Sequence, residues 1–448
     1  SSGGTLKTYR LALACTGEYA AFFGGTASGA MSGMVASTAR VNGVYEMELA
    51  VRLVLIANDN LLVYLNSATD PYTNNNGSTM LTENQNNITT VIGSANYDIG
   101  HVFSTGGGGV AGLGVVCSST GKARGVTGSS SPTADAYDID YVAHEMGHQF
   151  SGNHTFNSAL GSCAGGNRNA TTAYEPGSGI TIMAYAGICG ADDLAAHSIA
   201  YFHVKSGDEI GTFITTGGGN ACAVATATGN TPPTVAATGT GYNIPISTPF
   251  VLTATGSDAD GDAITYSWEE YDLGAAGVWN PTTGTGPLFR PFSPTTDPSR
   301  TFPKMSDIVN NVTTIGEFPA SYARTLNFRV TARDNRAGGG GVTNTATTTV
   351  VNVINTTTPF KVTAPNTAVT WPSGTSQTVT WDVSSTNTGT ISCANVKISL
   401  STDGGFTYPN VLIASTPNDG SEIITVPALL TTTARVKVEA VGNIFFDI

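Results

Sequence analysis

Charged side chains are scarce in this sequence, and basic ones are scarcer than acidic ones. Only 11% of the 448 residues are charged, and 19 basic against 32 acidic residues give a formal net charge of −13 at pH 7. Such a chain lacks a general positive field for nucleic acid or for an anionic membrane. It also lacks any run of about 20 apolar residues that could cross a bilayer. The composition therefore argues against nucleic-acid binding and against a membrane span.

Cysteine is present, but never as a C-x-x-C pair. The absence of that pair argues against zinc knuckles and thioredoxin-like redox sites. Wide spacing in an acidic chain favours structural disulfides, and therefore a secreted protein. Buried free thiols in a cytosolic protein are the alternative. The six cysteines are Cys15, Cys117, Cys163, Cys189, Cys222 and Cys393.

The chain changes character near residue 223. All six histidines and five of the six cysteines precede it, and Thr/Val-rich segments with Gly, Pro and Asn-Asp turns follow it. Alternating strand and helix signals predict an α/β domain over residues 1–225. The remainder predicts two all-β sandwiches of the immunoglobulin, cadherin or fibronectin type, over residues 231–355 and 357–448. The sequence ends just after the strand-like VKVEAV, which leaves open whether the last sandwich is complete.

Local patterns predict several elements of the first domain. LLVYL, after the turn NDN, predicts a strand. VAGLGVVC predicts an edge strand over Val110–Val116, with the preceding glycine run as a flexible lead-in. SGDE near Ser206 has the form of a capping box and predicts the start of a last helix. Apolar residues at helical spacing predict a helix over Asp138–Phe150.

The stretch VAHEMGHQFSGNHTF, Val142–Phe156, holds three of the six histidines. His144 and His148 are four residues apart, so on a helix both imidazoles project from one face and can hold one metal ion. Glu145 is placed to take a proton from a water on that metal. Small residues then allow a turn that returns His154 as a third ligand. Three nitrogen ligands and one open position are typical of a catalytic zinc site, whereas the alternative is a chance cluster of exposed histidines.

HEMGHQFSGNH resembles the zinc signature of the metzincin family of metalloproteases. Ser151 stands where that family usually has glycine, so we expect Gly152 or Asn153 to absorb the turn one position later. GSGITIMAYAGICG resembles the family's Met-turn and supplies Met183. Tyr185, two residues on, is a candidate donor to the reaction's oxyanion, as the resemblance to astacin-like and serralysin-like members implies; a buried structural ring is the alternative.

GGGGVAGLGVVCSSTGKARGV and the cysteine arrangement are similar to the adamalysin (reprolysin) branch of the metzincins. Thr155 departs from that branch, which usually has aspartate after the third histidine. The resemblance implies two disulfides, Cys163–Cys189 and Cys117–Cys222. The predicted edge strand could pair with an extended substrate, and the substrate-binding residues would be Val110, Gly112, Leu113 and Gly114.

In the β region, GSDADGDAITYSW sets Asp258, Asp260 and Asp262 at alternating positions. Clustered carboxylates could bind Ca²⁺, and an acidic turn entering a strand is the alternative. Taken together, the sequence predicts a secreted, monomeric zinc endopeptidase that acts on proteins or peptides through a water on the zinc ion and a glutamate base. The alternative function is an adhesion protein whose sandwiches bind matrix or polysaccharide, with the zinc domain as a degenerate scaffold.

Overall fold

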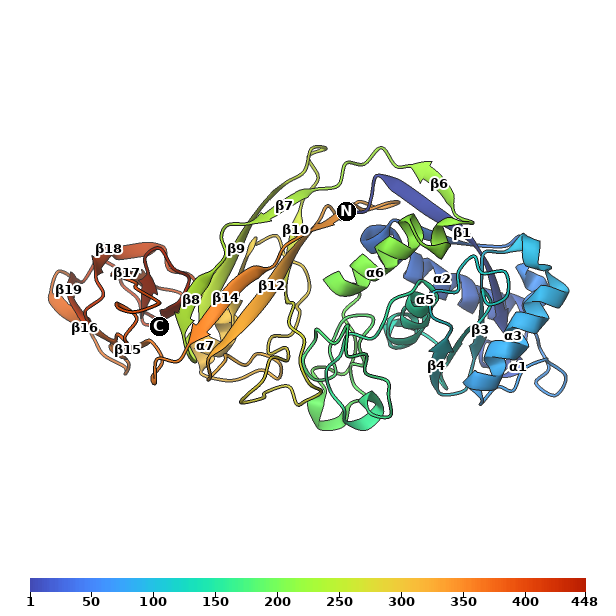
Figure 1. Ribbon diagram of the computed structural model, residues 1–448, viewed down its shortest axis with the longest axis horizontal. Coiled ribbons are helices and arrows are strands. Elements are labelled where there is room, and N and C mark those ends of the chain that lie inside the picture. Colours follow the sequence, from blue (N-terminus) through green and yellow to red (C-terminus); the bar gives the residue numbers. More distant parts are fainter.

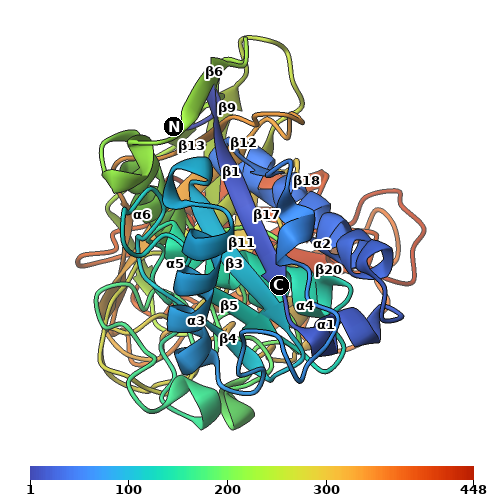
Figure 2. The same cartoon turned by 90° about the vertical axis from the view of Figure 1, so that its right-hand side faces the viewer.

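Strand β1 (Thr5–Cys15) forms the centre of the first sheet, and its side chains alternate between two cores. Leu11 and Leu13 pack into one core, whereas Ala12 and Ala14 pack into the other. That alternation follows from the two-residue period of a strand. The computed structural model describes residues 1–448. Helices cover both faces of the sheet that β1 organises (Figure 1, Figure 2).

The first sheet has six strands in the order β2-β1-β3-β5-β4, with β6 also paired to β1. β2, β3 and β5 run parallel to their neighbours, whereas β4 and β6 are antiparallel. β4 ends the order and is therefore an edge strand with one side open to a partner. The bounds are β2 (Val51–Leu55), β3 (Ile99–Ser104), β4 (Gly108–Ala111), β5 (Gly125–Gly128) and β6 (Val224–Ala227).

Helices α2 and α5 contribute to one core of this domain and α3 to the other. A π-helical turn, η3 (Asp138–Ala143), joins α4 to α5, so the backbone is helical from residue 135 to 149. No helix is both long and apolar enough to cross a membrane. The helices are α1 (Gly17–Phe22), α2 (Ala27–Leu49), α3 (Gly77–Val91), α4 (Asp135–Tyr137), α5 (His144–Gln149) and α6 (Val204–Thr215). The short 3₁₀ helices are η1 (Asp59–Leu62), η2 (Ser94–Asn96), η4 (Gly161–Cys163), η5 (Gly190–Asp192) and η6 (Gly218–Asn220).

The strand predicted for LLVYL does not form. Its first residues belong to η1, and Val63 makes only an isolated bridge to Cys15. The carboxylate of Asp59 accepts the backbone N–H of Leu13 at 2.8 Å. A side chain thus takes the amide with which a neighbouring strand would have paired.

The predicted edge strand is present but displaced. β4 spans Gly108–Ala111, so it includes glycines expected to be a lead-in, and LGVVC lies in turns. The chain leaves the sheet because the amides of Gly114 and Val115 bond the carbonyls of His148 and Gln149. Those carbonyls lie at the end of α5, where a helix leaves its acceptors unpaired.

Helix α6 begins two residues before the position predicted from SGDE. His203 is its N-cap, and its Nδ1 accepts the N–H of Lys205 at 3.1 Å. Ser206 lies inside the helix, and its buried hydroxyl has no hydrogen-bond partner. A histidine cap has no place in the usual list of capping residues, which explains the error.

Residues beyond 230 form many strands in several sheets. Strands β10-β12-β14-β8 with β13 form one sheet, and β11-β9-β7 another; β15-β16-β19 and β18-β17-β20-β21 form two more. The first two comprise β7 (Thr234–Ala237), β8 (Tyr242–Pro245), β9 (Phe250–Ser257), β10 (Thr265–Glu270), β11 (Ser299–Phe302), β12 (Arg324–Arg333), β13 (Val342–Asn344) and β14 (Thr349–Ile354), with helix α7 (Met305–Asn310). The others comprise β15 (Lys361–Ala364), β16 (Ser376–Asp382), β17 (Asn395–Ser401), β18 (Asn410–Pro417), β19 (Ser421–Thr425), β20 (Arg435–Ala440) and β21 (Phe446–Asp447).

The two β regions share one continuous hydrophobic core. Phe250 of the first region makes a β-bridge to Phe445 of the second. Phe360, at the start of the second region, packs its ring 5.1 Å from that of Phe445. The chain therefore crosses from one region to the other through buried aromatic contacts rather than through a solvated linker.

Buried charges join the α/β domain to the first β region. Arg333 of β12 donates to both carboxylate oxygens of Glu48, on α2, at 2.7 and 3.0 Å. Their side chains are only 4% and 8% exposed. Glu269 of β10 is fully buried and accepts the N–H of Val204 at 2.7 Å. A buried carboxylate is stable only with such partners. Each of the two regions therefore holds a buried carboxylate whose hydrogen-bond donor lies in the other region.

We predict that Arg333→Met destabilises the protein by about 3–5 kcal/mol, because it leaves the carboxylate of Glu48 buried without its partner. Denaturant unfolding measures the loss. Arg40→Met is the matched control: Arg40 pairs with Asp135 at an exposed site, and its loss is expected to cost less than about 1 kcal/mol. Equal effects of the two substitutions would contradict a structural role for the domain junction.

Candidate metal centre and active site

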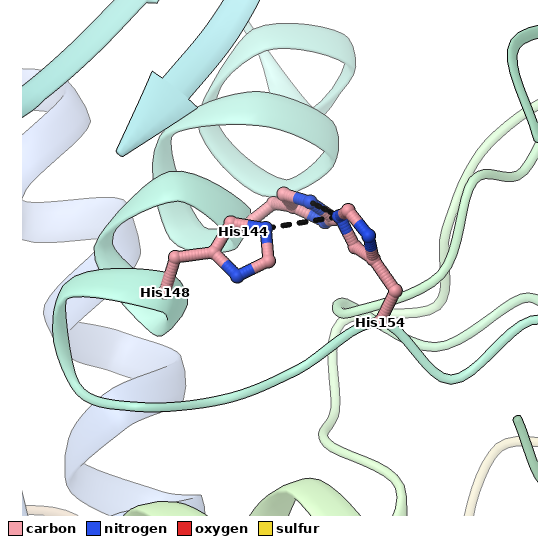
Figure 3. A group of neighbouring side chains, drawn as sticks. All are labelled: His144, His148 and His154. Carbon is pink, nitrogen blue, oxygen red and sulfur yellow. Dashed lines mark hydrogen bonds between the residues drawn. The ribbon is translucent and has the colours of Figure 1, made fainter. Parts of the chain in front are cut away.

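Three imidazoles converge at the end of α5. His144 and His148 lie one helical turn apart on α5, and His154 returns toward them on the following loop (Figure 3). The Nε2 atom of His154 lies 3.1 Å from that of His144 and 2.9 Å from that of His148. The structure therefore brings together the three histidines that the sequence selected.

The opposite nitrogen of each ring fixes its tautomer. Each Nδ1 donates to a backbone carbonyl, at 2.7 Å for His144, 2.7 Å for His148 and 2.6 Å for His154. A carbonyl can only accept, so each Nδ1 carries the proton and each neutral ring has its lone pair on Nε2. The acceptors are Ile182, Gly152 and Asn167.

The contacts dashed in Figure 3 consequently hold no proton between the nitrogens. Three lone pairs about 3 Å apart repel one another unless a cation lies among them. Burial, followed by the neighbouring His154, lowers the pKa of His148 to about 3. Burial likewise lowers the pKa of His144 and of His154, which keeps the set neutral. Three neutral nitrogen donors match the ligand set of a divalent transition metal such as zinc.

The turn after α5 differs from our expectation. Ser151 itself adopts φ = +79°, and neither Gly152 nor Asn153 has a positive φ. The N–H of Gly152 bonds the carbonyl of Gly147, and the N–H of Ser151 bonds that of His148. These two bonds define a Schellman motif, which requires its left-handed residue directly after the C-cap. The cost of that conformation for a residue with a Cβ is about 1–2 kcal/mol.

Met183 lies directly against the histidine helix. It is fully buried, and a Cβ placed on Gly147 would come within 2.4 Å of its sulfur. Its carbonyl accepts the N–H of Thr155, next to the third histidine. Met183 therefore packs against the helix that carries His144 and His148, and only glycine at position 147 leaves room for it.

Glu145 has a carboxylate oxygen without a partner inside the protein. The residue is 5% exposed, and its Oε2 makes no hydrogen bond. Gly109 of β4 approaches so closely that a Cβ there would lie 2.4 Å from Oε1. Burial raises the pKa of Glu145 to about 8. The group is thus suited to exchange a proton with a molecule bound beside it.

Tyr185 joins the same cluster through its ring. It stacks on Phe156 at 4.7 Å between ring centroids and meets His154 edge-on at 4.6 Å. Burial, then the charge of Glu145, raises the pKa of Tyr185, so its hydroxyl keeps its proton. The role of this hydroxyl as a donor to the oxyanion stays a prediction.

The four residues predicted to bind substrate differ in exposure and in the hydrogen bonds of their amides. Val110 lies in the edge strand β4, and Leu113 is 53% exposed in the turn after it. The amide of Gly112 bonds Arg124, and that of Gly114 bonds the end of α5. These two amides are consequently not available to pair with a substrate strand.

The cysteines pair as the family resemblance implies. Disulfides join Cys117 to Cys222 and Cys163 to Cys189. The second closes the loop that contains Met183, and Tyr185 packs against it. Cys15 and Cys393 are free and buried.

The acidic cluster is not part of this site. Carboxylate oxygens of Asp258, Asp260 and Asp262 lie within 4.8 Å of one another in the first β region. Backbone amides of Asp260 and Asp262 bond Asp258, and Thr231 bonds Asp260. The turn is therefore organised by its own chain, and calcium binding there stays a prediction.

Sequence reasoning missed the groups that orient the ligands. Two of the three acceptors, the carbonyls of Ile182 and Asn167, lie outside the histidine motif. Every residue has a carbonyl, so no residue type signals this role. Glu175, whose contacts are described below, was also missed because it belongs to no recognisable spacing.

Neutral imidazoles around a shared centre, with a buried carboxyl beside them, form a candidate site for metal-dependent hydrolysis. Residues 5–211 match the family described as Metallo-peptidase family M12B, Reprolysin-like. Residues 5–211 of this chain are therefore similar to that metallopeptidase family, as the motif resemblance predicted. No curated protein matches the chain.

A solved structure titled "Structures of Clostridium thermocellum CbhA fibronectin(III)-like modules" is also similar to the chain. It is 12% identical, covers 48% of this chain and 89% of its own, and superimposes with a TM-score of 0.16. So low a TM-score supports no conclusion about the arrangement of the sheets.

We predict that Glu145 makes the free energy of unfolding of the metal-free protein fall as the pH rises, and that Glu145→Gln lacks this contribution. The pKa of Glu145 is about 8 when folded and about 4.3 when unfolded. The folded state therefore binds the extra proton, and this stability is complete below about pH 4.3 and lost as the pH rises to 8. The expected slope is about 1.4 kcal/mol per pH unit, absent in Glu145→Gln. Urea unfolding with a chelator at pH 5 and pH 8 measures it; parallel behaviour of the two proteins would refute it.

Proposed function

We propose that this protein is a secreted zinc endopeptidase that hydrolyses peptide bonds in extracellular proteins. The observation that carries the proposal is the convergence of three unprotonated Nε2 atoms, from His144, His148 and His154, which fit zinc. A zinc ion held there supplies positive charge that polarises the scissile carbonyl and lowers the pKa of water. The match of residues 5–211 to a metallopeptidase family supports the same reaction.

Glu145 is the proton carrier in this proposal. Its free oxygen accepts a proton from the water that attacks the scissile carbonyl, and the carboxyl then delivers that proton to the leaving amine. The hydroxyl of Tyr185 donates to the oxyanion that develops on the carbonyl oxygen. The edge strand β4, which approaches Glu145 at Gly109, binds the substrate in an extended form.

For the whole chain we propose a catalytic domain followed by two β-sandwiches. The first domain was predicted to end at residue 225, and we extend it to Ala227, because β6 pairs with β1 of its sheet; the sandwiches cover residues 231–355 and 357–448. Two disulfides support a location in an oxidising, extracellular compartment. We further propose a monomer whose aspartate turn at Asp258 binds Ca²⁺ under extracellular conditions.

The intact set of metal donors and Glu145 favours catalysis over the alternative of an adhesion protein with a degenerate zinc domain. In a degenerate site, replacement of Glu145 or of one histidine would not impair function. Here backbone carbonyls orient all three rings, and Ser151 keeps an unfavourable positive φ in the turn that leads to His154.

We predict that Glu145→Gln retains one zinc ion per chain and loses nearly all turnover, because the residue carries protons but does not bind the metal. His148→Ala should lose the metal, and with it stability, since metal binding is linked to folding. Zinc content and cleavage of a denatured protein substrate measure both. Substantial cleavage by Glu145→Gln would remove that residue as the base. A wild-type protein that binds zinc but cleaves nothing would favour the adhesion alternative.

Tyr185→Phe is expected to lower kcat by about 10²–10³-fold with KM nearly unchanged, because the lost donor acts mainly in the transition state. The phenylalanine ring keeps the packing on Phe156, so zinc content and melting temperature should change little. A structural tyrosine would instead show reduced stability with kcat near that of the wild type. Measuring kcat and Tm on the same preparations separates the two roles.

A further inference from the structure

Glu175 is a fully buried carboxylate that accepts hydrogen bonds from two segments next to the candidate metal centre. Its Oε1 accepts hydrogen bonds from the hydroxyls of Thr155 and Thr181, each at 2.5 Å. Its Oε2 accepts from the backbone N–H groups of Ile180 and Thr181, at 2.7 and 3.1 Å. The charge of Glu175 is thus compensated by four donors, as a buried carboxylate requires.

The two hydroxyl donors come from two segments: one carries the proposed ligand His154, and the other carries the carbonyl that orients His144. Thr155 directly follows His154. Thr181 directly precedes Ile182, whose carbonyl accepts from His144. Glu175 therefore connects the backbone beside the third histidine to the backbone that orients the first one.

Backbone contacts reinforce the same connection. The N–H of Glu175 bonds the carbonyl of Thr155 at 2.8 Å, and the N–H of Thr155 bonds the carbonyl of Met183 at 3.1 Å. Hydrogen bonds to an ionised acceptor are shorter and stronger than neutral ones. The carboxylate thus joins loops that lack regular secondary structure in addition to the disulfide between Cys163 and Cys189.

We propose that Glu175 and Thr155 form a positioning pair that holds His154 at the correct separation from His144 for zinc. The inference rests on the proposed function and deepens it, because the pair touches no reacting atom. It also accounts for a departure seen in the sequence. Thr155 stands where adamalysins usually have aspartate, and the carboxylate is supplied here by Glu175, through the hydroxyl of Thr155.

Two substitutions of the same side chain test the pair. Thr155→Val keeps the shape of threonine and removes the hydroxyl, whereas Thr155→Ser keeps the hydroxyl. We expect Thr155→Val to weaken zinc binding about 10–100-fold, as is typical when a group supporting a metal ligand is lost, and Thr155→Ser to bind zinc as the wild type does. Competition with a chromophoric chelator measures the zinc dissociation constant without any need for turnover.

Thr16→Val is the matched control. Thr16 is also fully buried, and its hydroxyl caps α1 by accepting the N–H of Tyr19. Its loss should lower Tm and leave zinc affinity unchanged, which separates general destabilisation from positioning. Glu175→Ala, measured in the same assay, should weaken zinc binding at least as much as Thr155→Val.

Equal zinc affinity of Thr155→Val and Thr155→Ser would overturn the positioning role, and so would an equal loss of affinity in Thr16→Val. Failure of the wild-type protein to bind zinc at all would overturn the proposed function and this inference together. Zinc binding with the expected pattern but no cleavage of any protein would uphold the positioning pair and refute the endopeptidase.

Discussion

The candidate metal centre depends on three hydrogen bonds from imidazole Nδ1 atoms to backbone carbonyls. Each bond places the ring proton away from the centre and leaves a lone pair facing it. Without them, a histidine could rotate or change tautomer, and the neighbouring nitrogens would bond one another instead of a cation. The acceptors belong to three separate segments, so these segments must keep fixed positions relative to one another for the three rings to converge.

Much of the first domain can be interpreted as support for those segments. Gly147 admits Met183 against α5, and the N–H of Ile182 bonds the carbonyl of Tyr201. Tyr201 in turn lies under the guanidinium of Arg333, 4.9 Å from the ring centroid. A continuous series of contacts therefore runs from the first β region to the carbonyl that orients His144. The same region contains unfavourable features, including a buried carboxyl at Glu145 and a left-handed Ser151, as is common where function constrains structure.

The parts predictable from sequence were those governed by a fixed period. Helical spacing predicted the helix over Asp138–Phe150 and placed His144 and His148 on one face of it. Prediction failed where a hydrogen bond formed with a partner that the sequence pattern did not indicate. The carboxylate of Asp59 accepts the amide of Leu13, so LLVYL forms no strand beside it. His203 caps α6 in place of Ser206, and the Schellman motif gives Ser151, rather than Gly152 or Asn153, the positive φ. The roles of Ile182 and Glu175 had no signal, because they depend on which loops meet in space.

The buried pairing of Arg333 with Glu48 bears on how such a protein can evolve. Domains joined only by a linker can be exchanged between genes, since each half remains soluble by itself. Here a cut after the first domain would expose Glu48 without its partner and would leave Glu269 without the amide of Val204. Recombination at this boundary would thus produce two defective halves, and the α/β domain and the first β region are expected to be inherited as a single unit.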